Sequence, residues 1–503
     1  MNKKWIAGVM ALTLGVSVLA GCASEKETGD KPTVSVTVFD RGQISSSEGN
    51  YAENRWTKYI NEHSGVDVNW VPIPRNEATQ KINMLVASGD APDLIVEYDI
   101  ALMSSLVEQG VIQPIDEFVE KYSTEYKEYL EQNPSLRDFV TYNGKMYMAT
   151  SKRSQDAVIN HGMWIRRDWL DKLGLSMPQT AEELLEVARA FRDGDPDGNG
   201  INDTTAFSII NWHEIFPSMF QASNLWYNEN GEIKFGHTLD RYGESLRYMK
   251  TLYDEGLIDK EFITDKDGTR QRQLWVNGKA GIYTKSWTEV DNKELLQNNP
   301  NAQPAPLKPV STQYGLNALW QEAEPLYYVA FNRNIKDPAA AMKFLDWMIS
   351  DGWKTIKFGI EGEHYAEENG VPRVLDLEKQ TQEVSYAADY MVLSQWNVKP
   401  EWIPQMAAQD DLSQKLAQQR GESLKVNSEV SFRRDIPIEP PLESKMKLIS
   451  EFGTIRDDVR MKVIAGGSQY TPEWGMNELK REWTRLGGEA VEKEMTQWYN
   501  ANH

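Results

Sequence analysis

Cysteine is almost absent from this chain, which has one, Cys22, in 503 residues. A single cysteine excludes an internal disulfide and any multi-cysteine metal site. Positive charge is also scarce, because 54 Lys and Arg stand against 75 Asp and Glu, a formal net charge of −21. Nucleic acid is therefore not an expected partner, since it requires a basic surface. A small anionic ligand stays possible, because it responds to the local field of its site.

Apolar runs long enough to span a membrane are lacking as well. The N-terminal one, residues 5–19, follows Lys3 and Lys4 and is shorter than the roughly 20 residues of a membrane helix. It ends in Leu-Ala-Gly-Cys at residues 19–22, which resembles the lipobox of bacterial lipoproteins. The resemblance implies a signal peptide over residues 1–21 and a diacylglyceryl group on Cys22. An ordinary signal peptide with a chance cysteine is the alternative.

We therefore expect an extracytoplasmic protein that a lipidated N-terminal cysteine anchors to the cell membrane. Residues 22–31 are short and polar, and we expect them to act as a flexible tether.

Sequence motifs of common enzymes are missing too. His213-Glu214 lacks the second histidine that zinc proteases place four residues after the first, and Pro217 stands there instead. The mature chain has no serine-hydrolase elbow and no phosphate-binding glycine loop. Two rival classes remain open: a lipid-anchored polysaccharide hydrolase or lyase, and a calcium-stabilised surface adhesin. Of these, the hydrolase would need two carboxylates about 5–10 Å apart in a cleft.

The folded part begins with an alternation of strand and helix patterns. Residues 33–38 alternate apolar and polar side chains, residues 66–71 and 93–97 form two further apolar runs, and helical spacing fills the intervals. This order predicts a parallel sheet with right-handed crossovers. Ligands of such sheets lie at the carboxyl ends of the strands. The side chains at those ends are Asp40, Arg41, Glu97 and Tyr98.

Several segments in a fixed order are similar to the family 1 extracellular solute-binding proteins, in the branch of LplA and the alginate-binding proteins. The segments are Ala-Ser-Gly-Asp-Ala-Pro-Asp-Leu at 87–94, Tyr-Asn-Gly-Lys-Met-Tyr at 142–147, the run at 164–175, Asn-Gly-Lys-Ala-Gly at 277–281 and Gly-Ile-Glu-Gly-Glu-His-Tyr at 359–365. The resemblance implies an α/β, two-lobed periplasmic-binding-protein-like fold of class II type. The ligand cleft would lie between lobes joined by hinge segments.

This resemblance implies a division of the chain into lobes. The N-lobe would comprise residues 32–155 and return over residues 326–375, and the C-lobe would comprise residues 156–325. Residues 376–503 would form a C-terminal helical part that packs on both lobes.

A loop over residues 193–204 is dense in oxygen ligands, as calcium requires. One register begins at Asp195 and another at Asp193, and we prefer the first because it places Asp203 at position nine. A turn without metal is the alternative. The preferred register predicts a structural Ca²⁺ held by Asp195, Asp197, Asn199, the Ile201 carbonyl, Asp203 and Thr204. It is similar to the calcium loop of the alginate-binding relatives, where Glu often stands in place of Thr204.

Seventeen tryptophans are many for an exported chain of this size, and flat aromatic faces stack on sugar rings. For any single tryptophan, core or surface packing is the more common role. Trp287 and Trp212 follow apolar runs and resemble cleft aromatics of maltose-binding relatives, and Trp320 lies near the second expected lobe crossing. Weaker candidates for the sugar site are Trp396, Arg373 and Arg153.

The sequence thus predicts a solute-binding protein, not an enzyme, that closes about a hinge on a carbohydrate. We expect the carbohydrate to be an oligosaccharide and the further partners to be the permease subunits of an ABC transporter. We expect the chain itself to be a monomer.

Overall fold

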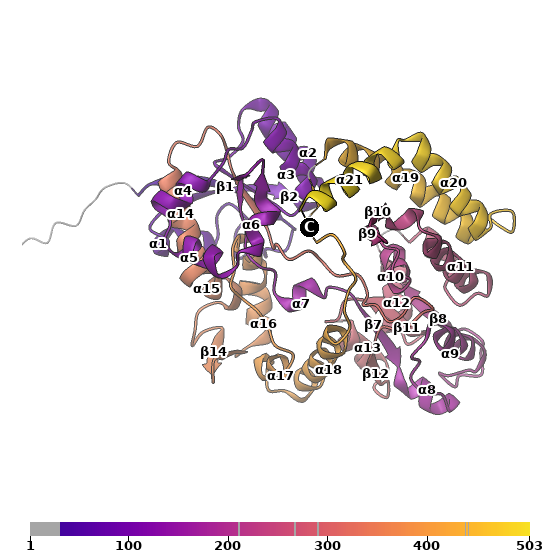
Figure 1. Cartoon of the computed structure of the whole chain (residues 1–503). Coiled ribbons are helices and arrows are strands. Elements are labelled where there is room, and N and C mark those ends of the chain that lie inside the picture. The colour runs from indigo at the N-terminus through magenta and orange to yellow at the C-terminus, as the bar shows by residue number, and fades with distance from the viewer. Residues whose placement is uncertain are drawn as a thin grey trace, which may run out of the picture.

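The structure, a computed structural model, describes residues 31–502 except 210–211, 266–267, 289–290, 438 and 441. Cys22 and the predicted signal peptide lie outside the described residues. Figure 1 shows two α/β lobes side by side, with the N-terminal part of the chain in one and the C-terminal helices over the other. We call them the first and second lobes, after the order of their sheets in the chain.

The first lobe is built on a five-stranded sheet in the order β2-β1-β3-β13-β6. Its strands are β1 (Thr33–Asp40), β2 (Asp67–Pro74), β3 (Leu94–Glu97), β6 (Met148–Ala149) and β13 (Tyr328–Phe331). The predicted parallel arrangement is confirmed for β1 with β2 and β3. Strand β13, which arrives much later in the sequence, pairs antiparallel to β3 and β6, so the sheet is mixed.

Helices cover this sheet because their apolar faces complete its core. They are α1 (Arg55–His63), α2 (Ala78–Ser88), α3 (Ile100–Glu108), α4 (Asp116–Tyr122), α5 (Glu125–Gln132), α6 (Ser135–Val140), α14 (Pro338–Trp347) and α15 (Trp353–Phe358). Asp337 caps α14 by accepting from the Ala340 N–H, with Pro338 in the first turn. The short hairpin of β4 (Thr141–Tyr142) and β5 (Lys145–Met146) turns at Asn143 and Gly144, both with positive φ.

The second lobe contains a four-stranded sheet in the order β12-β7-β11-β8. Its strands are β7 (Gly162–Arg166), β8 (Thr205–Ile209), β11 (Ala280–Lys285) and β12 (Pro304–Leu307), and the hairpin β9 (Trp226–Glu229) with β10 (Glu232–Phe235) lies apart from the sheet. Its helices are α8 (Arg167–Leu173), α9 (Ala181–Asp193), α10 (Trp212–Met219), α11 (Asp240–Asp254), α12 (Thr269–Val276) and α13 (Asn292–Asn298).

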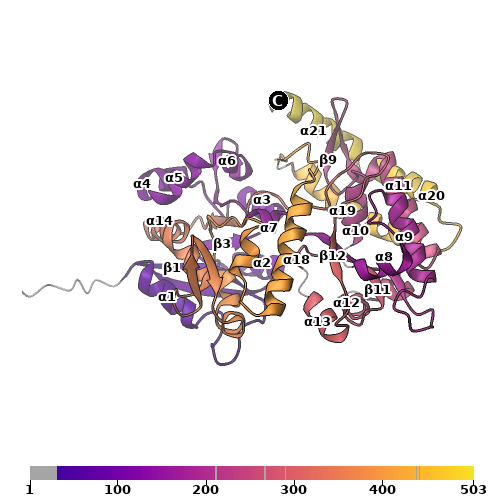
Figure 2. The same cartoon turned by 90° about the horizontal axis from the view of Figure 1, so that it is seen from below.

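The last part of the chain serves both lobes. Residues 384–393, which include the 3-10 helix η6 (Ser385–Tyr390), contribute to the core of the first lobe. The helices that follow are α17 (Trp402–Met406), α18 (Asp411–Ser428), α19 (Glu443–Ala465), α20 (Pro472–Arg485) and α21 (Gly488–Asn502). Helix α18 packs on β12 and lies between the lobes in Figure 2, whereas α19 contacts α11 and α21 contacts β10. Smaller elements are α7 (Gln155–Val158), α16 (Leu377–Lys379) and the hairpin β14 (Tyr365–Glu368) with β15 (Val371–Val374).

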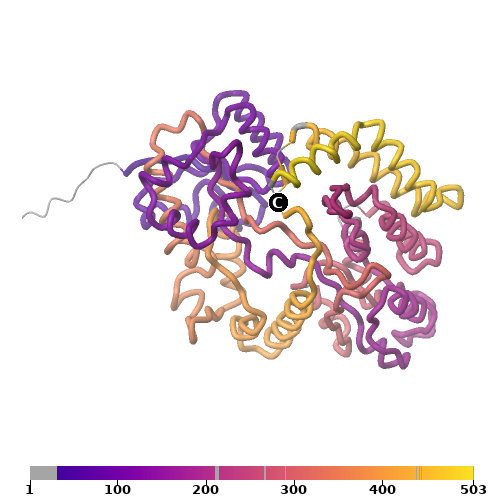
Figure 3. Tube along the Cα trace, in the orientation of Figure 1, coloured from indigo at the N-terminus to yellow at the C-terminus, as the bar shows by residue number. Residues whose placement is uncertain are grey.

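Three stretches of chain pass between the lobes, and they can be followed in Figure 3. We call residues 150–161, 320–327 and 394–402 the first, second and third crossing segments. The first lies between the other two, since Leu326 N–H donates to the Ser151 carbonyl and Ser394 N–H donates to the Ser151 hydroxyl. Three adjacent, hydrogen-bonded crossings are the arrangement expected of a hinge between two lobes.

Candidate functional site

The carboxyl ends of β1 and β3 bring predicted site residues together. Arg41 follows β1 and Tyr98 follows β3, and the Arg41 Nη2 group donates to the Tyr98 hydroxyl at 3.4 Å. The Tyr98 hydroxyl donates to that of Tyr327, at the start of β13, with 2.6 Å between the oxygens. The Tyr98 ring lies parallel to Phe39 with 5.4 Å between centroids. We call Phe39, Arg41, Tyr98, Tyr327 and the neighbouring Arg75 the strand-end rim.

Two guanidinium groups, Arg75 of the rim and Arg153 outside it, lie on the aromatic faces of the rim. The Arg75 guanidinium, just after β2, lies 4.8 Å from the Phe39 centroid and 5.2 Å from that of Tyr98. The Arg153 guanidinium, in the first crossing segment, lies 5.9 Å from the Tyr98 centroid and donates to the Pro325 carbonyl at 3.1 Å. Stacking of this kind holds a guanidinium in place while its N–H edge stays available to a ligand.

The carboxylates beside the rim, those of Asp389, Glu97 and Asp40, form hydrogen bonds within the protein. Asp389 accepts from the Arg41 Nε at 2.7 Å, and its burial raises the pKa of this carboxyl, an effect that Arg41 opposes. Glu97 is 2% exposed, and burial raises its pKa although the N–H groups of Tyr98 and Asp99 donate to it. Asp40 accepts from the Gly42 N–H at 2.9 Å. The rim therefore presents hydroxyl, aromatic and guanidinium groups.

Trp320 stands at the start of the second crossing segment and is half-buried. Its ring meets Phe432 edge-on with 5.8 Å between centroids, and the Arg434 guanidinium lies 5.9 Å from its centroid. Arg434 also donates to the Gln321 carbonyl at 2.6 Å. Burial raises the pKa of Tyr328 on β13, and the positive charges of Arg153 and Arg434 oppose this rise. The positive charge of Arg434 therefore affects Tyr328, a residue of the first lobe.

A cavity of about 620 Å³ lies at the hinge itself. All three crossing segments contribute to its wall, as do α5 and the chain after α18. Its lining includes Lys152, Arg153, Gln321, Glu324, Trp396, Asn397 and Phe432. Because every crossing segment contributes to its wall, the cavity would change shape if the lobes moved. A ligand bound in it would therefore favour one hinge conformation over another.

Trp287 and Trp396, both predicted as sugar contacts, share a second cavity of about 510 Å³. The Trp287 indole is 6% exposed and donates to the Asp156 carbonyl at 2.6 Å. Trp396 is 9% exposed and packs on Phe358, with 4.9 Å between ring centroids. Lys357 lines the same cavity, and burial lowers the pKa of its ammonium group. Trp287 therefore fastens the second lobe to the first crossing segment, and Trp396 fastens the third crossing segment to α15 of the first lobe.

Two predicted residues stand apart from these groups. Arg373 lies on β15 and pairs with Glu368 across its own hairpin at 2.6 Å, beside a separate surface cavity of about 290 Å³. The side chain of Trp212, at the start of α10, lies outside the described residues. The sequence prediction missed Tyr327, Asp389, Arg75 and Arg434. The adjacent Arg433-Arg434 pair was a usable signal, whereas nothing local to Asp389 indicates Arg41 as its partner.

The predicted calcium loop follows α9 and turns through residues with positive φ, namely Asp195, Gly198 and Gly200. Asp195 accepts from the N–H groups of Asn199 and Gly200, both at 3.1 Å. The carboxylates of Asp197 and Asp203 converge on one cation, the Lys279 ammonium, at 2.9 and 2.8 Å. This ammonium lowers the pKa of Asp203.

The Lys279 ammonium therefore balances the two carboxylates in this structure, and the calcium ion that the oxygen-rich loop predicts stays a prediction. Thr204 departs from the predicted set, because its hydroxyl donates to the Phe191 carbonyl at 2.9 Å. Asp193, the first residue of the alternative register, pairs with Arg192 at 2.6 Å. The register that begins at Asp195 thus stays a prediction, with Thr204 turned away from the proposed ligand set.

A second group of side chains with metal-ligand atoms close together consists of Glu363, His364 and Glu383. His364 is fully buried, its Nε2 lies 3.2 Å from Glu383, and its Nδ1 accepts from the Ile360 N–H. Arg55 pairs with Glu383 and Lys379 pairs with Glu363. Cations of the protein already balance both carboxylates, so the group forms an ion-pair network beneath α1.

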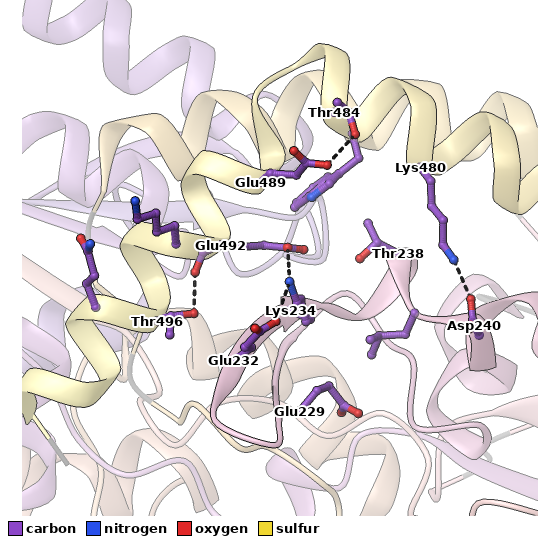
Figure 4. Close-up of a pocket in the computed structure, with 14 residues that line it drawn as sticks. Glu229, Glu232, Lys234, Thr238, Asp240, Lys480, Thr484, Glu489, Glu492 and Thr496 are labelled. Carbon is purple, nitrogen blue, oxygen red and sulfur yellow. Dashed lines mark hydrogen bonds and ion pairs between the residues drawn. The ribbon is translucent and has the colours of Figure 1, made fainter.

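A groove of about 840 Å³ lies in the second lobe between β10 and helices α20 and α21, as Figure 4 shows. Lys234 pairs with Glu492 at 3.1 Å across it, and Lys480 pairs with Asp240 at 2.6 Å at its edge. These charged groups are thus paired with one another, and the crossing segments contribute nothing to its wall.

Two lobes on mixed sheets, three crossing segments and a polar aromatic rim beside them define a hinged binding protein. The sequence profile of the family described as bacterial extracellular solute-binding protein matches residues 45–355, and the chain belongs to this family. None of the helices in the described residues has both the length and the apolar character that crossing a membrane requires.

Individual relatives give more detail. The chain is 26% identical to lipoprotein LipO of Bacillus subtilis, over 100% of this chain and 99% of LipO. It is also 26% identical to the polygalacturonan/rhamnogalacturonan-binding protein YtcQ of Bacillus subtilis, over 73% of this chain and 75% of YtcQ. Among solved structures, it is similar to Streptococcus pneumoniae FusA, an ABC-transporter substrate-binding protein, in complex with kestose. The TM-score is 0.69 at 19% identity, covering 94% of this chain and 100% of FusA. This last likeness shows the fold, and it confirms the predicted two-lobed architecture.

Proposed function

We propose that this chain captures an oligosaccharide between its lobes and delivers it to the permease of an ABC importer. The observation that carries the proposal is the strand-end rim, where Tyr98, Tyr327 and Arg41 meet beside the crossing segments. Aromatic faces suit the C–H faces of sugar rings, and hydroxyl and guanidinium groups bond sugar hydroxyls. The names of YtcQ and of the FusA–kestose complex give independent support for a carbohydrate ligand.

Hinge closure would convert binding into a signal for the importer. A ligand that contacts both lobes stabilises the closed form by its differential affinity for that form. Residues 32–155 and 326–375 would move as one lobe and residues 156–325 as the other. The helices after residue 376 would stay with the parts on which they pack.

The proposal includes a structural Ca²⁺ in the loop at 193–204 and a lipid anchor on Cys22. A solved FusA structure is described as an EF-hand mutant, which supports the ion, and LipO is named a lipoprotein, which supports the anchor. When bound, the ion would supply positive charge that fixes the loop after α9. Replacing Cys22 by Ala should move the protein from the membrane fraction to the soluble fraction, and continued membrane retention would refute the anchor.

Thermal unfolding against a panel of oligosaccharides tests the binding class. The protein would be the chain from residue 23, which contains every described residue. A ligand at a hundred times its Kd stabilises the folded state by about 2.7 kcal/mol. We expect at least one oligosaccharide to raise the unfolding temperature and to be recovered intact, as a binding protein requires. Hydrolysis or elimination of the sugar would assign the chain to the enzymes, and no shift with any sugar would refute the proposal.

A further inference from the structure

Some guanidinium groups beside the strand-end rim and the hinge cavity form ion pairs with carboxylates of the protein, and others do not. Arg41 pairs with Asp389, and Lys152 of the hinge cavity pairs with Glu324 at 2.8 Å. Within the described residues, none of Arg75, Arg153 and Arg434 has a carboxylate within ion-pair distance. Burial raises the pKa of Glu97 and of Asp389, however, and the positive charge of Arg75 opposes that rise. This concentration of unpaired positive charge occurs in a chain whose net charge is −21.

Each of these three arginines is held in a way that leaves N–H donors over. Arg75 rests on Phe39 and Tyr98, and among the described residues its guanidinium has no hydrogen-bond acceptor. Arg153 and Arg434 each donate to a backbone carbonyl, of Pro325 and Gln321 respectively. A guanidinium has five donors, so most of this capacity is unused.

The arginines also stand on both sides of the lobe boundary. Arg75 belongs to the first lobe, Arg153 to the first crossing segment, and Arg434 follows α18 and lies against Trp320 and Phe432. Burial lowers the pKa of Arg434, and the negative charges of Glu439 and Glu322 oppose this change without forming an ion pair with Arg434. Glu439 pairs instead with Lys445 at 3.0 Å. Keeping a half-buried guanidinium without a counter-charge costs free energy, which a ligand with its own negative charge would offset.

We propose that the solute is an acidic oligosaccharide, whose carboxylate or sulfate groups are bound by Arg75, Arg153 and Arg434. This inference rests on the proposed function and specifies its substrate class. Planar guanidinium groups match carboxylates in a two-bonded geometry and also bind sulfate oxygens. Aromatic rings at the same place would hold the sugar body, so charge and ring recognition occur at one site.

Isothermal titration calorimetry with matched ligands tests this class. The probes are short oligomers of galacturonate and of mannuronate, each beside its methyl ester, then a sulfated galactose oligomer beside its desulfated form, and neutral kestose. We expect at least one acidic oligomer to bind about tenfold or more tightly than its neutral counterpart, with affinity that falls as salt rises. The uronate and sulfate arms show which acidic group is recognised.

Two variants connect that preference to the arginines. Arg75→Gln and Arg434→Gln should each weaken the acidic oligomer about tenfold and reduce its advantage over the neutral form. Arg247→Gln is the control, because Arg247 lies on the surface of α11, 52% exposed and paired with Glu473. If a variant fails to fold, the salt dependence of the unaltered protein still shows whether positive charge of the protein recognises the acidic groups.

The outcomes separate the two levels of the argument. Tighter binding of kestose or of the neutral forms would overturn the acidic class and leave the proposed function in place. Equal losses for the acidic and neutral partners in both arginine variants would also overturn it. Failure of every oligosaccharide to bind would refute the proposed function and this inference together.

Discussion

Arg41 and Asp389 lie 348 positions apart in the chain, and the Arg41 Nε donates to the Asp389 carboxylate at 2.7 Å. The bond joins the end of β1 to η6, just before the third crossing segment. It therefore links the strand-end rim to the part of the chain that leaves the first lobe. Because the Asp389 side chain is 6% exposed and that of Arg41 is 31% exposed, loss of the arginine would leave a buried carboxylate without its partner.

The first prediction follows from this pair. Arg41→Gln should destabilise the protein by about 1–3 kcal/mol, the cost of an unpaired buried charge. The double variant Arg41→Gln, Asp389→Asn should lose less than the sum of the single variants, because the residues interact directly. Urea denaturation of all four proteins measures this coupling. Strictly additive losses would show that the pair is not an energetic unit.

The calcium register gives the second prediction. Ca²⁺ should raise the unfolding temperature of the unaltered protein, and a chelator should reverse the rise. Asp203→Ala should weaken this response, because the preferred register uses the Asp203 carboxylate as a calcium ligand. Asp193→Ala is the matched control, since Asp193 pairs with Arg192 outside the converging set. The opposite pattern, with Asp193 essential and Asp203 dispensable, would establish the alternative register.

Two tryptophans should separate binding from stability. Trp320 is half-buried beside Arg434, so Trp320→Ala should weaken sugar binding about tenfold or more with little loss of stability. Trp287 is 6% exposed and hydrogen-bonded, so Trp287→Ala should cost about 3–5 kcal/mol of stability. Calorimetric titration and urea denaturation of both variants measure the two quantities. Unchanged affinity in Trp320→Ala would remove Trp320 from the sugar site.

Glu214 on α10 gives a prediction about pH. Burial raises the pKa of Glu214 from its ordinary value of 4.5 to about 7, and the Asn224 N–H donates to its carboxylate. A raised carboxyl pKa means that folding binds a proton, so this contribution to stability is present below pH 4.5 and is lost as pH rises through 7. Between pH 5 and 8, stability should fall by about 2–3 kcal/mol relative to Glu214→Gln. Parallel pH profiles of the urea midpoint would contradict the assignment.

The sequence predicts the parts of the site that follow from local pattern. Alternation locates β1, and the rule that ligands lie at strand carboxyl ends identifies Arg41 and Tyr98, which the structure does bring together. Asp389, Tyr327 and Arg434 come from distant parts of the chain, and only the paths of β13 and the third crossing segment place them nearby. Periodicity within a short window contains no information about such pairings.

Tryptophan shows a different limit. Sequence context suggested Trp287 and Trp320 equally as sugar contacts, yet one is nearly buried and the other half-buried. A flat aromatic ring serves a sugar and an apolar core equally well, so residue type alone does not separate the two roles. The packing around each ring separates the two roles.

A crystal structure with the tightest-binding oligosaccharide tests the central claim most directly. We predict sugar between the lobes, in contact with Tyr98 of the strand-end rim and with Trp320 or Arg434 on the other side, and lobes closer together than in the sugar-free protein. Sugar bound to one lobe alone, or in the groove between β10 and α21, would contradict capture by hinge closure.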